Sequence, residues 1–239
     1  MKTLLRTTTF ALLLAFTFQL NAQNISIGLK GGVQMANVKV PGFIEDSQYL
    51  PDFQAIATPN LGLVTEIELH PNFAIQPEIS WTQKGFQATE NFDVNLFNVN
   101  VPLGATAITK FNYVEMPLLA KAKFGNFYLL AGPTFGYAVN GKLQTRANLV
   151  ITEIDLYNTD INLDKVGYER WEVGGMAGAG VAIPVFNGGH IFLDARYAHG
   201  FTQPYDIPLV HEKVLHRNFG LNLGFTVPIG GGKAAQPRA

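Results

Sequence analysis

Polar and apolar side chains alternate over most of the chain, and the alternation has the period of a β-strand. Between Val114 and Phe124 the even positions are apolar, whereas the charged residues Glu115, Lys121 and Lys123 stand at odd positions. Successive side chains of a strand point to opposite faces, so a strand places all three charges on one face. A helix would spread them around its axis. The segment is therefore predicted to be a strand.

Eight such segments follow one another, and no long helical pattern competes with them. They are Ile25–Val38, Asn60–His70, Phe73–Phe86, Thr109–Phe124, Phe127–Asn140, Trp171–Val185, His190–Phe201 and His216–Ile229. The connections after the second, fourth and sixth segments are tiny, whereas the others are long, covering about 39–59, 87–108, 141–170 and 202–215. Outer-membrane barrels have short periplasmic turns and long outer loops. The pattern predicts an all-β fold, an eight-stranded antiparallel up-and-down transmembrane β-barrel.

Alternation alone does not orient a barrel, because a soluble lipocalin-like barrel also has eight strands, with its apolar side chains inside. Here, however, the charged face also carries the glycines, and small residues suit the crowded interior of an eight-stranded barrel. The apolar face carries large aromatic residues near the strand ends, as expected for belts at the bilayer interfaces. The predicted belt residues are Phe73, Trp81, Phe124, Phe127, Tyr137, Trp171 and Tyr197.

With this orientation, the charged residues of the strands point into the lumen. They are Lys30, Glu66, Glu68, Glu78, Lys84, Glu115, Lys121, Lys123, Glu172, Asp194 and Arg196. Unpaired charges in a narrow interior are costly, so we expect a network of ion pairs that plugs the bore and prevents ion conductance. Glu115 has a second interpretation, as a proton carrier or a contact for a translocated substrate, but the structural ion pair is the favoured one.

The two ends of the chain differ from the strands. Residues 1–22 combine a basic start, Lys2 and Arg6, with the short apolar run Phe10–Phe18 and a small residue, Ala22, at the expected cleavage point. This is the pattern of a secretory signal peptide. We therefore divide the chain into a signal peptide (1–22), a barrel (23–229) and a polar tail (230–239). The expected location is the bacterial outer membrane, with both termini in the periplasm.

Composition removes several classes of function. Charged residues make up 15% of the chain, against roughly 25% in soluble domains. There is no cysteine, hence no disulfide framework and no thiolate metal site. The formal net charge of −1 argues against nucleic acid as a partner. Gly178-Ala179-Gly180 lacks the third glycine of a dinucleotide fingerprint, because Ile183 stands in its place. No nucleotide or other cofactor is expected.

One group of residues near the fourth long connection has the composition of a metal or catalytic site. It consists of His199, His211, His216, Asp206 and Glu212. Such residues can bind a divalent metal or supply a base, as in outer-membrane proteases and acyltransferases. No serine stands in a recognisable nucleophile setting beside them, and their spacing matches no established ligand pattern. The favoured interpretation is therefore that no metal site and no catalytic site exist.

Several short motifs resemble the PorT-like outer-membrane β-barrel proteins of Bacteroidetes. Tyr113–Leu119 is similar to the family's Tyr-x-Glu-x-Pro-Leu-Leu strand, and Ala131–Tyr137 is similar to the strand that follows it. Further similar segments are Gly28–Gly32, Gly178–Val181 and Arg196-Tyr197 followed by Gly200. The resemblance implies an eight-stranded outer-membrane barrel and, through the family's namesake, an association with type IX protein secretion. It stops at Ile229, before the polar tail.

Three functions fit these observations. The favoured one is a non-enzymatic barrel, embedded in outer-membrane lipid, that contacts envelope or secretion proteins through its loops or its rim. The second is an enzyme at the outer rim that acts on lipid or peptide. The third is a soluble, lipocalin-like ligand carrier in the periplasm.

Overall fold

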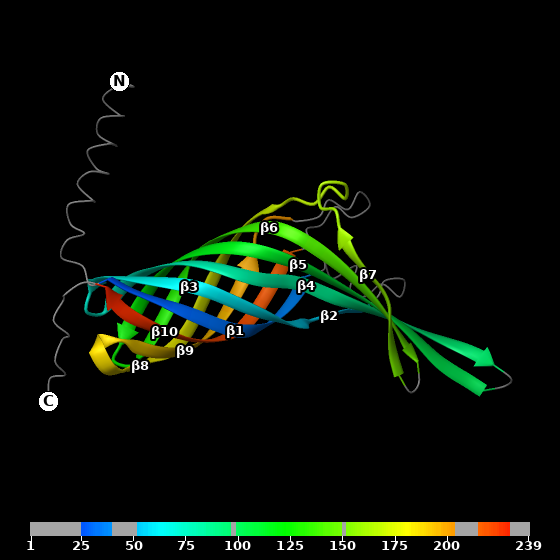
Figure 1. The fold of residues 1–239 in the computed structure, drawn as a ribbon, viewed down its shortest axis with the longest axis horizontal. Helices are drawn as coiled ribbons and strands as arrows, with labels where there is room; N and C mark the ends of the chain where they lie inside the picture. Colours follow the sequence, from blue (N-terminus) through cyan, green and yellow to red (C-terminus); the bar gives the residue numbers. More distant parts are fainter. Residues whose placement is uncertain (1–24, 40–51, 97–98, 150–151, 204–214, 230–239) are drawn as a thin grey trace, which may run out of the picture.

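The fold is a closed ring of eight long strands. The computed structural model describes residues 25–39, 52–96, 99–149, 152–203 and 215–229 (Figure 1). The ring consists, in order, of β1 (Ile25–Lys39), β3 (Ile56–His70), β4 (Phe73–Leu96), β5 (Val99–Phe124), β6 (Phe127–Leu149), β8 (Trp171–Pro184), β9 (His190–Gly200) and β10 (Leu215–Ile229). The predicted signal peptide and polar tail lie outside the described residues.

Every neighbouring pair in the ring is antiparallel, and the first and last strands close it. β1 pairs with β3 on one side and with β10 on the other, from Ile25 opposite Ile229 to Lys39 opposite Leu215. A closed ring has no edge strand, so all backbone groups of its strands can pair within the wall. The eight-stranded antiparallel barrel predicted from the alternation is confirmed.

The three tight connections lie at one end of the barrel, together with the start of β1 and the end of β10 (Figure 1). Between β5 and β6 the turn has only two residues, and its first residue, Gly125, has φ +63°. Glycine adopts this conformation without a steric penalty, which suits the first position of a two-residue hairpin. A short 3₁₀ turn, η2 (Phe186–Gly188), joins β8 to β9.

At the opposite end the expectation of long loops is wrong in part. β4 and β5 stay paired through the predicted loop 87–108, as far as Leu96 opposite Val99. β6 continues to Leu149 and pairs with an additional strand, β7 (Thr152–Ile161), and the short β2 (Asp52–Gln54) pairs with β4. These extensions project beyond the ring (Figure 1). The alternation of the sequence continues there as well, because Phe92, Val94 and Leu96 of β4 are separated by Asp93 and Asn95, so the pattern does not mark where the ring ends.

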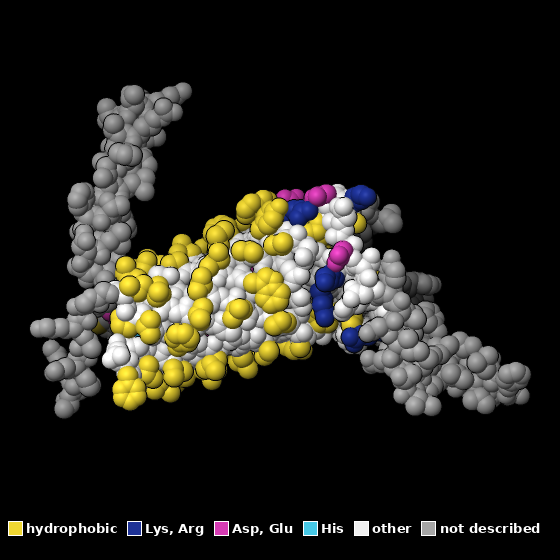
Figure 2. All heavy atoms as spheres, viewed as in Figure 1, with side chains coloured by type: hydrophobic (Ala, Val, Ile, Leu, Met, Phe, Trp, Pro, Cys, Tyr) yellow, Lys and Arg dark blue, Asp and Glu magenta, His cyan; other side chains and the backbone are white. Residues whose placement is uncertain are grey.

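The outer face of the ring is apolar and exposed (Figure 2). In β10 the exposed residues include Phe219, Leu221 and Leu223, which alternate with the buried Asn218 and Asn222. All seven predicted belt aromatics have exposed side chains, Phe73, Trp81, Phe124, Phe127, Tyr137, Trp171 and Tyr197. Among the described residues there is no helix long and apolar enough to cross a membrane. The orientation is the reverse of a lipocalin, whose apolar side chains face inward.

Candidate functional site in the barrel lumen

The middle of the lumen is filled by an ion-pair cluster that we call the central cluster, made of Lys30, Glu78, Asp194 and Arg196. All four side chains are buried, and they come from β1, β4 and β9. The Arg196 guanidinium donates from Nη1 to both oxygens of Glu78, at 2.9 Å each, and from Nε and Nη2 to the two oxygens of Asp194, at 2.7 and 2.8 Å. Lys30 donates to the Glu78 carboxylate. This fork geometry satisfies the charges that burial would otherwise penalise.

Uncharged groups complete the central cluster around Asp194. Its carboxylate accepts hydrogen bonds from the Tyr128 hydroxyl at 2.8 Å and from Asn222 Nδ2 at 2.9 Å. Gln76 Nε2 donates to Glu78 Oε1 at 2.6 Å. The lumen glycines make room for these side chains, because a Cβ on Gly180 would lie 2.6 Å from Tyr128 Cζ and from Asp194 Cβ. The glycine face noted in the sequence therefore serves the packing of the charged face.

A second ion-pair cluster, the upper cluster, lies nearer the projecting strands. Lys84 Nζ is 2.6 Å from Glu115 Oε1 and 2.6 Å from Glu172 Oε1. The other oxygen of Glu172 is 2.8 Å from His216 Nδ1. The sequence did not lead us to predict a lumen position for His216, because we had grouped it with the candidate metal or catalytic residues near the fourth long connection. Its even position on β10, shared with Asn218 and Asn222, was the signal that places it on the lumen face.

A third ion-pair cluster, the lower cluster, lies by the tight turns. Lys121 Nζ is 2.8 Å from one oxygen of Glu66, and Lys123 Nζ is 3.2 Å from the other and also pairs with Glu68. Lys121 is buried and its Nζ lies 4.1 Å from the Tyr128 ring centroid, a cation–π contact. All eleven charged residues predicted to face the lumen are thus inside the barrel and take part in ion pairs.

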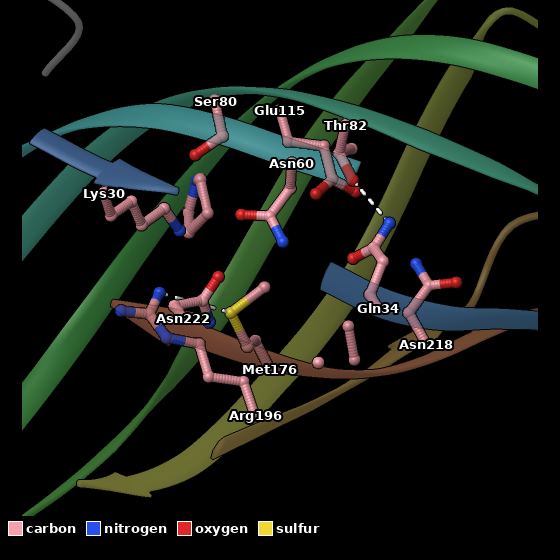
Figure 3. A pocket seen from close by; sticks show the side chains of 13 residues that line it. Lys30, Gln34, Asn60, Ser80, Thr82, Glu115, Met176, Arg196, Asn218 and Asn222 are labelled. Carbon is pink, nitrogen blue, oxygen red and sulfur yellow. Dashed lines mark hydrogen bonds between the residues drawn. The ribbon is translucent and has the colours of Figure 1, made fainter. Parts of the chain in front are cut away.

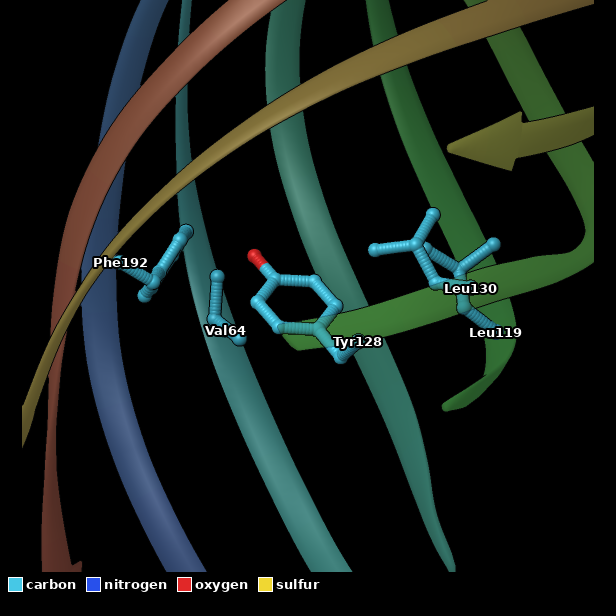
Figure 4. Close-up of a cluster of buried hydrophobic side chains, with 5 residues drawn as sticks. All are labelled: Val64, Leu119, Tyr128, Leu130 and Phe192. Carbon is cyan, nitrogen blue, oxygen red and sulfur yellow. The ribbon is translucent and has the colours of Figure 1, made fainter. Parts of the chain in front are cut away.

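Apolar side chains occupy the lumen between the lower and central clusters. Val64, Leu119, Tyr128, Leu130 and Phe192 form a buried cluster contributed by β3, β5, β6 and β9 (Figure 4). Tyr128 and Leu130 had interrupted the small-residue pattern of their strand in the sequence. They point inward and help to fill the bore.

The upper end of the lumen is covered by a capping segment, which consists of residues 162–170 between β7 and β8. Its Leu163 and Tyr168 are buried against Phe111 and Tyr113, on the lumen face of β5. The Tyr168 ring stacks on Phe111 at a centroid distance of 4.6 Å, and its hydroxyl shares a hydrogen bond with that of Tyr113. Burial raises the pKa of the Tyr168 hydroxyl, so the group stays protonated at neutral pH.

The free space left in the central part of the lumen is small. A cavity of about 30 Å³ lies between the central and upper clusters and is lined mainly by polar side chains (Figure 3). Three atoms of these side chains, Asn60 Oδ1, Ser80 Oγ and Asn218 Oδ1, are buried without a hydrogen-bond partner. A polar cavity of this size holds one or two water molecules. A larger cavity, of about 120 Å³, lies at the tight-turn end beside the lower cluster.

Two histidines of the suspected metal or catalytic group, His199 and His216, lie on opposite faces of the barrel wall. His216 faces the lumen, whereas His199 lies on the outer face beside Tyr197 and Phe201. Asp206, His211 and Glu212 lie outside the described residues. Within the described part of the chain, no group of three or more His, Asp or Glu side chains is placed to hold a metal ion.

Comparisons with known proteins place the chain among barrels. The model of a family described as "Outer membrane protein beta-barrel domain" matches residues 21–206. Similar solved structures include Ail of Yersinia pestis (12% identity, TM-score 0.39, 85% of this chain and 99% of that one). Others are Neisserial surface protein A (9%, 0.36, 85% and 97%) and OprG of Pseudomonas aeruginosa (12%, 0.30, 87% and 98%). No curated protein matched the sequence.

Proposed function

Because this chain belongs to the outer membrane protein β-barrel domain family, it is an outer-membrane β-barrel protein, and we propose that it acts as a closed, non-enzymatic membrane scaffold. In this proposal the tight turns and both termini face the periplasm, and the projecting strands face the outside of the cell. The scaffold contacts envelope or secretion proteins through these projecting strands or through the rim.

The observation that carries the proposal is the filling of the lumen. Three ion-pair clusters, an apolar layer and the capping segment follow one another along the bore, and the central cavity has room for one or two waters only. A pore or an uptake channel needs a continuous wet path, which these layers oppose. A rigid wall that moves nothing across the membrane is suited to holding other proteins in place.

The projecting strands provide the surface for such partners. Beyond the ring, β2, β4, β5, β6 and β7 form one continuous sheet, held by the pairing of β4 with β2 and β5 and of β6 with β5 and β7. β7 makes ladder pairs with β6 alone among the described strands. An edge strand with unpaired backbone groups is a common docking element for extended segments of other proteins. The PorT-like motifs make a secretion component the first partner to examine.

Conductance and crosslinking test the two halves of the proposal. In planar bilayers the full mature protein should show no steady open level, and a stable open level would contradict the closed lumen. In the native envelope, a photo-crosslinking residue in place of the exposed Asn158 on β7 should capture the same few proteins in repeated experiments. The same residue in place of Leu221, on the lipid-facing side, should capture none of them. Crosslinks at position 158 to lipid alone would overturn the scaffold role.

The orientation has its own test. Lys165 lies in the capping segment and is exposed, so trypsin added to intact cells should cleave there if the projecting end is outside. Cleavage only after the outer membrane has been permeabilised would reverse the proposed orientation.

A further inference from the structure

Two lysines lie side by side on the outer face of the wall. Lys110 on β5 is directly opposite Lys142 on β6 in the strand register. Their neighbours Phe111 and Gly141 face inward, against the capping segment, so both lysines point away from the lumen. Figure 2 shows that charged side chains, basic ones with some acidic ones beside them, begin where the apolar surface ends.

Neither lysine is neutralised within the described part of the chain, where no ion pair is formed by Lys110 or Lys142. Asp160 on β7 is opposite Lys142, but no ion pair joins the two residues. Inside the barrel, by contrast, Lys30, Lys84, Lys121, Lys123 and Arg196 each pair with a carboxylate. Like charges directly opposite each other destabilise a sheet, and Asp160 is the only carboxylate opposite either lysine among the described residues, so a further anion would stabilise the pair.

The register across β4, β5 and β6 shows at what depth the lysines lie. One outward row consists of Trp81, Val114 and Tyr137. The next row consists of Gln83, Asn112 and Asn140, joined by hydrogen bonds of 2.9 and 2.6 Å between the amides. The lysines form the row after that. Polarity therefore rises from aromatic to amide to cationic over three successive rows of one surface.

The length of the apolar surface places the aromatic row at a bilayer boundary. From Phe127, beside the tight turn, to Tyr137 the strand β6 rises ~33 Å. At a strand tilt of about 40° this corresponds to ~25 Å across the membrane, the height of the apolar band of such barrels. The lysine row lies roughly 10 Å further out, within reach of lipid headgroups for side chains that extend along the surface.

A shorter succession, from an aromatic row directly to a cationic one, occurs at a second place in the wall. On β9 and β10, Phe219 is opposite Tyr197, and in the next outward row Arg217 is opposite His199. Arg217 Nε is buried and has no hydrogen-bond partner. As at Lys110 and Lys142, a cation on the outer face follows an aromatic row, here without an amide row between them.

We propose that the outer-face cations Lys110 and Lys142, with Arg217 at the second place, bind the phosphate groups of a phosphorylated glycolipid in the outer leaflet. The lysines attract the phosphate, the Asn112 and Asn140 amides lie at the level of the polar headgroup, and the aromatic row contacts the acyl chains below it. This inference rests on the proposed orientation of the barrel, with the projecting strands outside the cell.

The test is native mass spectrometry of the full mature protein in neutral detergent, titrated with bisphosphorylated lipid A. Replacing both lysines by glutamine (Lys110→Gln with Lys142→Gln) should weaken lipid A binding roughly tenfold to thirtyfold. The Lys110→Arg, Lys142→Arg pair should retain binding, and so should Lys165→Gln, which removes an exposed lysine of the capping segment. Lipid A from which the phosphates have been removed should bind the unmodified protein as weakly as the glutamine variant binds lipid A.

Unchanged lipid A affinity in the glutamine variant would overturn the proposal. So would inorganic phosphate that forms adducts and displaces lipid A at equal concentration, since the site would then be one for the free ion. The conductance and crosslinking experiments do not involve these lysines, so the closed scaffold can fail while lipid binding stands, and the reverse. Cleavage of Lys165 on intact cells checks the shared premise separately.

Discussion

Glu78 and Arg196 meet across the full width of the barrel, with Arg196 Nη1 2.9 Å from both carboxylate oxygens of Glu78. Their strands, β4 and β9, lie opposite each other in the ring of eight. The side chains reach each other because Gly178, beside Arg196, leaves space that a Cβ would take up, at 3.0 Å from Arg196 Cγ. The Arg196 guanidinium binds two carboxylates at once and thereby links β9 to β4 through the lumen.

Replacement of Arg196 by methionine should lower the free energy of unfolding by about 3–5 kcal/mol, because Glu78 and Asp194 would lose their shared partner while remaining buried. The measurement is urea unfolding in detergent micelles, followed by tryptophan fluorescence. Lys165→Ala is the matched control and should change the free energy by less than about 0.5 kcal/mol, as expected for an exposed position. If Arg196→Met lowers the free energy of unfolding no more than the control does, the contacts of Arg196 with Glu78 and Asp194 do not stabilise the barrel.

Gly180→Val should destabilise the barrel by about 1–3 kcal/mol, the usual effect of overpacking. The added side chain would occupy the space of the Tyr128 ring and the Asp194 Cβ, each only 2.6 Å from where a Cβ would stand. Ala179→Val, on the exposed face of the same strand, serves as the comparison and should be close to neutral. Equal unfolding midpoints for both variants would contradict the tight lumen packing.

The Tyr168→Ala variant should open the capping segment without unfolding the barrel. It removes the ring that stacks on Phe111 at 4.6 Å, and local opening becomes more frequent when such an anchor is lost. Trypsin should then cleave at Lys165 and Arg170 roughly tenfold faster. Val166→Ala, in the same segment but exposed, should leave the rate unchanged. The prediction fails if cleavage in Tyr168→Ala proceeds at the rate of the unmodified protein.

The hydrogen bonds from Arg170 to Asp164, at 2.9 and 3.0 Å, lower the pKa of the Asp164 carboxyl. Since the folded pKa lies below the unfolded value, the stabilisation is present above the unfolded pKa of about 3.9 and is lost as the pH falls through the folded pKa. An NMR titration should place the Asp164 midpoint below that unfolded value. In Arg170→Gln the midpoint should rise, and an unmoved midpoint would assign the shift to another cause.

The strands and their lumen charges were predictable because lipid imposes a strict alternation on them. The eleven charges follow that parity from Lys30 to Arg196, and the structure places each on the lumen side. His216 also stands at an even position, like the lumen-facing Asn218 and Asn222 of its strand. Its position next to a long connection suggested a loop residue instead. Pairing partners were not predictable, since a partner such as Arg196 for Glu78 depends on which strands face each other across the ring.

The projecting strands were missed although the sequence carries a signal for them. Alternation continues past Phe86 and Asn140, with Phe92, Val94 and Leu96 in one segment and Leu143 and Leu149 in the other, but both segments were interpreted as outer loops. The capping segment escaped for another reason, because Leu163 and Tyr168 are isolated apolar residues in a polar stretch. Their burial depends on Phe111 and Tyr113, which are distant in sequence and are brought together only by the closed ring.

The sequence distance between ion-pair partners also constrains how such a chain enters a bilayer. Glu78 and Arg196 are 118 residues apart, and the hairpin of β3 and β4 holds an excess of carboxylates whose lysines and arginine belong to other strands. A hairpin inserted alone would therefore carry bare charges into hydrocarbon, which is strongly unfavourable. The carboxylate of Glu78 meets its Arg196 partner only when β9 arrives, so we expect insertion of the early hairpins to be coupled to closure of the ring.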